Sequence, residues 1–151
     1  MTFAPTTGGR QDRSAVYQAG SATKPVLQTL SDPGTLTFCD GTYYVNLALR
    51  VPGIVLSGLN GRDTTLLDGG LQGTVVTVHA DAQISGLTLT HGKSGDSGGG
   101  LVVLGGKLAV SNTRLDGNEA TSFGGGLYAQ RATVTLTKTE VAGNKAHSGG
   151  G

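Results

Sequence analysis

The chain has 151 residues, a formal net charge of +1, 27 glycines and one cysteine. This length indicates a single domain, and a balanced charge without a basic stripe argues against nucleic acid as a partner. One cysteine excludes an intrachain disulfide, and no apolar run is long enough to span a bilayer.

The N-terminal region differs in composition from the rest of the chain. Residues 1–20 are polar and contain glycine, and we interpret them as a tail or a loose cap. In the capping segment 21–34, Thr23 can cap a helix and Pro25 fits its first turn. A short amphipathic helix is therefore predicted within Ser21–Ser31, lying across the first coil of the region that follows.

The region 35–151 repeats with a period of about 26 residues. The stretch "LAVSNTRLDGN" (Leu108–Asn118) overlays "VTLTKTEVAGN" (Val134–Asn144) without a gap. Each period holds three short stretches in which apolar and polar residues alternate, which is typical of strands. Repeated units of three short strands predict a solenoid, here of about four to five coils.

Equivalent apolar positions form columns that are predicted to point inward. Cys39, in the first column, is interpreted as a small buried residue and not as a reactive thiol. The first column is Cys39, Leu67, Leu89, Leu115 and Val141, the second is Leu49, Val75, Leu101 and Leu127, and the third is Ile54, Ala82, Leu108 and Val134.

Glycine triplets and asparagines recur at fixed places in the period. The triplets are predicted to be corners at which a repeated backbone leaves no room for a Cβ. Asn118 and Asn144 share a column, and stacked Asn side chains can hydrogen-bond along a stack and satisfy corner backbone groups. The triplets are Gly98, Gly99 and Gly100, then Gly124, Gly125 and Gly126, and finally Gly149–Gly151.

Several of these motifs resemble a known group of proteins. "CDGTYYVNLAL" and "IVLSGLNGRDTTLLDG" resemble coils of right-handed parallel β-helix proteins of the pectate-lyase-like superfamily. The later coils resemble repeats of chlamydial-type polymorphic outer-membrane proteins, which pair a GGA(I/L/V) element with an FxxN element. "GGGL" at Gly98–Leu101 and Gly124–Leu127 stands for the first element, and "LDGN" at Leu115–Asn118 and "VAGN" at Val141–Asn144 stand for the second. The resemblance implies a right-handed coil, in a superfamily that includes both enzymes and adhesins.

One column of polar residues is a candidate catalytic site. It reads Asp40, Asp68, Thr90, Asp116 and Ala142, one residue after the first apolar column. Stacked carboxylates can hold calcium or act as acid and base. However, Asp40, Asp68 and Asp116 each precede a glycine, and an Asp-Gly pair is a turn signal. These three are weak catalytic candidates, and no metal or cofactor ligands are assigned.

The remaining polar residues are predicted to lie on the surface. The three histidines, His79, His91 and His147, share no column, although His91 replaces a corner glycine. Arg114 and Glu140 share a column and are predicted to pair across neighbouring strands. Outward threonines are frequent but form no regular array in this alignment, so β-propensity explains them better than ice binding.

These observations predict an all-β, right-handed parallel β-helix with a short N-terminal capping helix. We expect it to be the N-terminal part of a bacterial surface or secreted repeat protein, extracellular and lacking its leader in this chain, truncated in its C-terminal coil. The expected function is non-enzymatic, namely to present a stiff face for adhesion or assembly. Expected partners are a surface glycan, a protein receptor or a second copy at the open C-terminal edge. The alternative is a carbohydrate-active β-helix enzyme, a polysaccharide lyase or hydrolase, or a carbohydrate-binding module.

Overall fold

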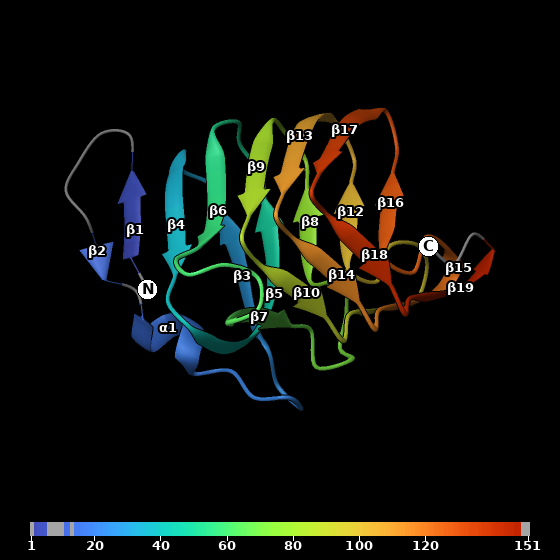
Figure 1. Ribbon diagram of the computed structural model, residues 1–151, viewed down its shortest axis with the longest axis horizontal. Coiled ribbons are helices and arrows are strands. Elements are labelled where there is room, and N and C mark those ends of the chain that lie inside the picture. Colours follow the sequence, from blue (N-terminus) through green and yellow to red (C-terminus); the bar gives the residue numbers. More distant parts are fainter. Residues whose placement is uncertain (1, 6–10, 13, 149–151) are drawn as a thin grey trace.

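The computed structural model describes residues 2–5, 11–12 and 14–148, with side chains from residue 16 onward. These residues form a right-handed parallel β-solenoid of about four turns, with one helix of five residues near the N-terminus (Figure 1). The chain advances along the long axis of the molecule, so each coil lies beside the preceding and the following one (Figure 1). The predicted fold class is confirmed.

Three walls and one short side sheet surround the core (Figure 1). The front wall contains β4 (Gly34–Phe38), β6 (Ile54–Gly58), β9 (Ala82–Ser85), β13 (Gly106–Ser111) and β17 (Ala132–Thr137). The lower wall contains the first half of β5 (Gly41–Leu49), then β7 (Thr65–Asp68), β10 (Thr88–Thr90), β14 (Arg114–Asp116) and β18 (Glu140–Ala142). The rear wall contains β3 (Val26–Leu30), the second half of β5, β8 (Val76–Val78), β12 (Leu101–Val103) and β16 (Leu127–Ala129). The side sheet contains β11 (Lys93–Ser94), β15 (Glu119–Phe123) and β19 (Lys145–Ser148).

The core is built from stacked apolar columns, because alternate residues of each strand point inward. Leu115 is fully buried, and its register neighbours are Leu89 and Val141. The column through Ile54, Ala82, Leu108 and Val134 also forms as predicted. The repeat therefore places the apolar residues of these coils in the core.

The earliest coils differ from the predicted columns. Cys39 is exposed in the turn before β5, and Tyr43 is the inward partner of Leu67. In the rear wall, Val76 pairs with both Leu47 and Leu101, so the predicted pairings of Val75 with Leu49 and with Leu101 are both wrong, whereas Leu101 and Leu127 pair as predicted. The physical reason is the loop at residues 59–64, between β6 and β7, which is longer than the equivalent corner between β9 and β10. A constant period therefore misaligns residues on the N-terminal side of this loop. Val75 is misaligned with Leu101 because the segment between β7 and β8, residues 69–75, is shorter than the segment between β10 and β12, residues 91–100.

The N-terminal end also differs from the prediction. The helix α1 spans Ser14–Gln18, whereas the segment predicted to be helical contains strand β3. This segment forms a strand because β3 pairs in parallel with β5 along its whole length, which satisfies its backbone hydrogen-bonding groups. Tyr17 of α1 is buried and contacts Phe38 edge to face, with ring centroids 5.9 Å apart.

Two further strands lie at the N-terminal edge of the front wall. Strand β1 (Thr2–Pro5) pairs antiparallel with β4 and with β2 (Gln11–Asp12). An antiparallel neighbour covers the row of backbone groups that β4 would otherwise expose. The region interpreted as a tail or a loose cap thus contains two strands of the front-wall sheet.

The core register can be tested with two adjacent residues. We expect Leu115→Asp to lower the free energy of unfolding by at least about 4 kcal/mol, because it places an unpaired charge between Leu89 and Val141. Asp116→Ala should change it by less than about 1 kcal/mol, because this half-buried side chain points outward. Urea unfolding measures both, and a larger loss for Asp116→Ala would contradict the register.

Candidate functional site

The predicted acidic column forms only in part. Asp68, Thr90, Asp116 and Ala142 are successive register partners in the lower wall. Asp40 does not belong to this column, because the partner of Asp68 on β5 is Tyr44. The structure therefore contradicts the predicted adjacency of Asp40 and Asp68.

The side chain of Asp40 instead holds the long loop between β6 and β7. Its Oδ1 accepts hydrogen bonds from Asn60 Nδ2 at 3.0 Å and from Thr64 Oγ1 at 2.9 Å. These contacts connect the Asp40–Gly41 turn to the loop at residues 59–64 in the adjacent coil. Turn chemistry thus accounts for Asp40.

Asp68 forms a pair that the sequence columns do not reveal. Its Oδ2 lies 2.8 Å from Nδ1 of His91, and its Oδ1 accepts a hydrogen bond from the backbone N–H of Gly70 at 2.8 Å. The Asp68 side chain is 10% exposed, whereas the His91 side chain is 57% exposed. A largely buried carboxylate therefore holds an exposed imidazole in one orientation.

His91 also has an unusual backbone. Its φ is 50°, and the equivalent corner residues of the next two coils, Gly117 and Gly143, have φ of 66° and 63°. Leu71 nearby has φ of 58°, and its N–H donates to the carbonyl of His91 at 2.7 Å. A residue other than glycine rarely adopts such angles. The substitution of His91 for a corner glycine is the one sequence signal that points to this pair.

The pair lines a pocket of about 480 Å³ on the lower side of the solenoid. Residues of the segment before β3 and of the turn after β7 contribute to its lining. Its lining combines an aromatic ring, apolar side chains and polar groups, from Ala22, Thr23, Tyr44, Asp68, Gly70, Leu71, Gln72 and His91.

The asparagine ladder forms as predicted at the corner before the side sheet. Asn118 Oδ1 accepts from the N–H of Gly92 at 2.9 Å, and its Nδ2 donates to the carbonyl of Leu89 at 3.0 Å. The same Nδ2 lies 3.0 Å from Asn144 Oδ1, and Asn144 Nδ2 donates to the carbonyl of Leu115 at 2.8 Å. Two side chains thus bond the corners of three coils, which is a structural role.

The glycine triplets pack directly on this ladder. A Cβ on Gly100 would lie 2.7 Å from Asn118 Nδ2, and a Cβ on Gly126 would lie 2.6 Å from Asn144 Nδ2. The middle glycines face the backbone of the side sheet, and the first glycines have φ of 70° and 54°. The prediction that these corners leave no room for a Cβ is confirmed for Gly98, Gly99, Gly100, Gly124, Gly125 and Gly126. Gly149–Gly151 lie outside the described residues.

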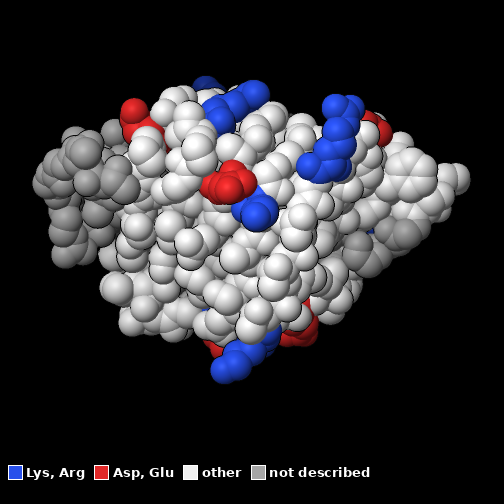
Figure 2. Space-filling view, turned by 90° about the horizontal axis from the view of Figure 1, so that it is seen from above, with Lys and Arg blue, Asp and Glu red and all other residues white. Residues whose placement is uncertain are grey.

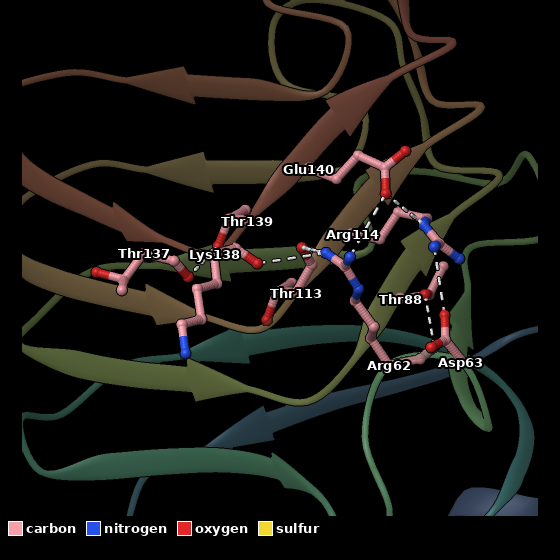
Figure 3. A network of polar contacts seen from close by, with 9 residues as sticks. All are labelled: Arg62, Asp63, Thr88, Thr113, Arg114, Thr137, Lys138, Thr139 and Glu140. Carbon is pink, nitrogen blue, oxygen red and sulfur yellow. Dashed lines mark hydrogen bonds and ion pairs between the residues drawn. The ribbon is translucent and has the colours of Figure 1, made fainter.

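A network of ion pairs crosses the coils between the front and lower walls (Figure 3). Arg114 Nε lies 3.0 Å from Glu140 Oε2, which confirms the predicted cross-strand pair, and its Nη2 lies 3.2 Å from Asp63 Oδ1. Arg62 Nη2 approaches the same Glu140 oxygen at 3.7 Å. Hydrogen bonding to Glu140 raises the pKa of Arg114, so this guanidinium stays charged.

Arg62 forms contacts with three other coils in this network (Figure 3). Its carbonyl accepts from Thr88 Oγ1 at 2.8 Å, and its Nη1 donates to the carbonyls of Thr113 at 3.2 Å and Lys138 at 3.3 Å. Thr88 begins β10 of the next coil, whereas Thr113 and Lys138 lie at the corners of the two coils after it. We call this set of contacts the Arg62 brace.

The outer face of the front wall carries a column of hydroxyl groups. The sequence alignment predicts no regular array of outward threonines. The register shows that one column contains a hydroxyl residue in all five parallel strands: Thr37, Ser57, Ser85, Ser111 and Thr137. The neighbouring outward column is uncharged but mixed: Thr35, Val55, Gln83, Ala109 and Thr135. The irregularity therefore belongs to the second column alone.

His79 lies at the corner between the rear and front walls, beside Arg50. Burial lowers the pKa of His79, and the positive charge of Arg50 lowers it further. The imidazole is thus neutral in the folded protein at a pH where a free histidine is already partly charged.

The asparagine ladder predicts a specific stability loss. Asn118→Ala removes the partners of Gly92 N–H and the Leu89 carbonyl at a buried corner, so we expect about 3 kcal/mol lower stability. The matched control is Asn60→Ala, whose exposed side chain contacts Asp40 and should cost less than about 0.5 kcal/mol. Urea unfolding measures both free energies. A loss for Asn118→Ala as small as that expected for Asn60→Ala would contradict a stabilising role of the ladder.

The position of His79 predicts a pH dependence. Its folded-state pKa is depressed, so the unfolded chain binds more protons as the pH falls below about 6.5. Stability should therefore decrease from that pH down to the folded-state pKa. Arg50→Ala should raise the pKa of His79 and reduce this loss, as measured by NMR titration of the imidazole. A titration at or above the ordinary pKa would refute the assignment.

Charged groups give little further information on the site. Charged side chains are few and scattered on the face shown in Figure 2. Among the described residues, no three His, Cys, Asp or Glu side chains are grouped to hold a metal. No helix in the part of the chain that the structure describes is long and apolar enough to cross a bilayer.

No family model, curated protein or solved structure matches the chain.

Proposed function

We propose that this solenoid is a non-catalytic scaffold that presents the outer face of its front wall for adhesion, as part of a bacterial surface or secreted protein. The observation that carries this proposal is the unbroken hydroxyl column from Thr37 to Thr137. Successive hydroxyls in such a column lie about 4.8 Å apart, since that is the spacing of paired strands.

This face is suited to an uncharged, extended partner. Serine and threonine hydroxyls both donate and accept hydrogen bonds. They lose less side-chain entropy on binding than long side chains such as lysine or glutamine. The ten residues of the two outward columns include no charged side chain. A surface glycan lying along the solenoid axis meets these conditions, and a protein receptor is the other partner that we expected from the sequence.

The internal bonding of the coils supports a stiff scaffold. The asparagine ladder ties successive corners together, and the Arg62 brace links coils that are not adjacent. Because the register of the columns is fixed by these contacts, a ligand that spans several coils does not have to order them on binding.

A second copy of the chain is a further partner that stays a prediction. The outer side of the last described coil carries half-buried apolar residues, including Val134 and Val141, and Leu136 is 43% exposed. Either a second copy or additional coils of the same chain would cover them.

A carbohydrate-active enzyme is the second candidate function. One observation favours it, namely the pairing of Asp68 with an exposed His91 in a pocket. A carboxylate that orients an imidazole is an arrangement found in general-base catalysis. Product release from a polysaccharide therefore separates this candidate from simple adhesion.

The adhesive face is tested by binding to insoluble cellulose, chitin and mannan and to pectin with and without calcium. We expect retention of the wild-type chain on at least one neutral polymer. Ser85→Arg and Ser111→Arg should each weaken it at least tenfold, because each long cation interrupts the hydroxyl column. The matched control, Thr29→Arg, changes an exposed rear-wall position and should bind normally.

Two results would overturn the adhesive proposal. One is equal retention of the Ser85, Ser111 and Thr29 variants, or no retention of the wild type on any polymer. The other is steady release of soluble oligosaccharides that Asp68→Ala abolishes, which would identify an enzyme.

A further inference from the structure

We propose that the pocket around Asp68 and His91 binds a neutral sugar ring. This binding site is separate from the proposed adhesive face, because the pocket lies on the lower side of the solenoid and not on the hydroxyl column. Four features of the pocket support it: an oriented imidazole, a corner residue at positive φ, apolar lining residues and a lining without lysine or arginine.

The first feature is the orientation of the imidazole. Asp68 Oδ2 lies 2.8 Å from His91 Nδ1, so the carboxylate favours the tautomer that carries its proton on Nδ1. Nε2 of the neutral ring then carries a lone pair, and no hydrogen bond to it is present among the described residues. With 57% of the side chain exposed, Nε2 can accept a hydrogen bond from a ligand hydroxyl.

The second feature is the backbone at the corner. The next two coils have glycine at this corner, Gly117 and Gly143. The coil that contains β10 has His91 there instead, at a φ of 50°. Leu71, also at positive φ, donates its N–H to the His91 carbonyl at 2.7 Å. Strain of this kind collects at ligand sites, where the surrounding structure holds it in place. His91 thus combines positive φ with a position in the pocket lining, beside a second residue at positive φ.

The third feature is the apolar part of the lining, beside the polar groups. Tyr44 is the register neighbour of Asp68 on the adjoining strand, and Leu71 is 51% exposed. Both line the same pocket of about 480 Å³, which is within the range of ~300–1,000 Å³ for small-molecule sites. A sugar ring has an apolar C–H face that can stack on an aromatic ring while its hydroxyls reach polar groups at the edge.

The fourth feature is the charge of the lining. Asp68 contributes a negative charge, and none of the lining residues is lysine or arginine. The remaining lone pairs of Asp68 and that of His91 Nε2 need donors, which sugar hydroxyls supply. An anionic sugar such as a uronate would bring a second negative charge into the pocket, so it should bind more weakly.

Saturation-transfer NMR on the full chain tests the pocket directly. The probes are the methyl glycosides of glucose, galactose, mannose and N-acetylglucosamine, with methyl glucuronide as the anionic comparison. We expect at least one neutral glycoside to bind, and His91→Gly to weaken it at least tenfold. Because His91→Gly installs the residue used at this corner by the next two coils, its melting temperature should equal or exceed that of the wild type.

Two control variants separate this site from other effects. Asn112→Gly relieves a positive φ of 45° at another corner, and it should leave glycoside binding unchanged. Ser111→Arg changes an exposed position of the hydroxyl column and should also leave glycoside binding unchanged, so failure of the adhesive proposal does not affect this result. The proposal is overturned if none of the four neutral glycosides binds, if His91→Gly binds them as the wild type does, or if the glucuronide binds more tightly.

Discussion

Every part of this structure depends on the requirement that each coil repeats the backbone path of the coil beneath it. Parallel neighbours lie about 4.8 Å apart, so a side chain that fits one corner must also fit against the same corner of the next coil. Glycine meets this condition where two backbones approach closely, as at Gly100 and Gly126. Asparagine meets it where corner N–H and carbonyl groups would otherwise be buried without partners, as at Asn118.

The same requirement makes departures from the repeat informative. Gly117 and Gly143 show the residue that the lower corner needs, and His91 departs from it. The departure is accompanied by a buried carboxylate partner, a second residue at positive φ and a pocket. On the front wall the reverse holds, because five coils place a hydroxyl at one outward position where the core imposes no choice of side chain. The front wall is thus distinguished by a repeated hydroxyl residue, and the lower corner by a residue, His91, that departs from the repeat.

The sequence predicts the later coils well and the first coils poorly, because the lengths of the turns vary in the first coils. From Leu108 onward the repeats overlay without a gap, so the apolar columns, the glycine corners, the asparagine ladder and the Arg114–Glu140 pair could all be identified. Before the loop at residues 59–64 a fixed period misplaces residues, and Cys39 takes the position that belongs to Tyr43. Strand β3 was mistaken for a helix because Thr23 and Pro25 resemble a helix start, although the backbone of β3 pairs with β5. The Asp68–His91 pair was missed because it joins different positions of adjacent coils, so no column contains both residues.

The Arg62 brace has a consequence for how the molecule comes apart. In most solenoids each repeat touches only its neighbours, and terminal repeats can detach one at a time. Here the side chain of Arg62 reaches the corners at Thr113 and Lys138, two and three coils further along. Detaching the last described coil breaks its contact with Arg62 as well as its contacts with the coil beneath. The brace therefore couples the C-terminal coils to the middle of the solenoid, so that fraying from that end is opposed by residues far from it.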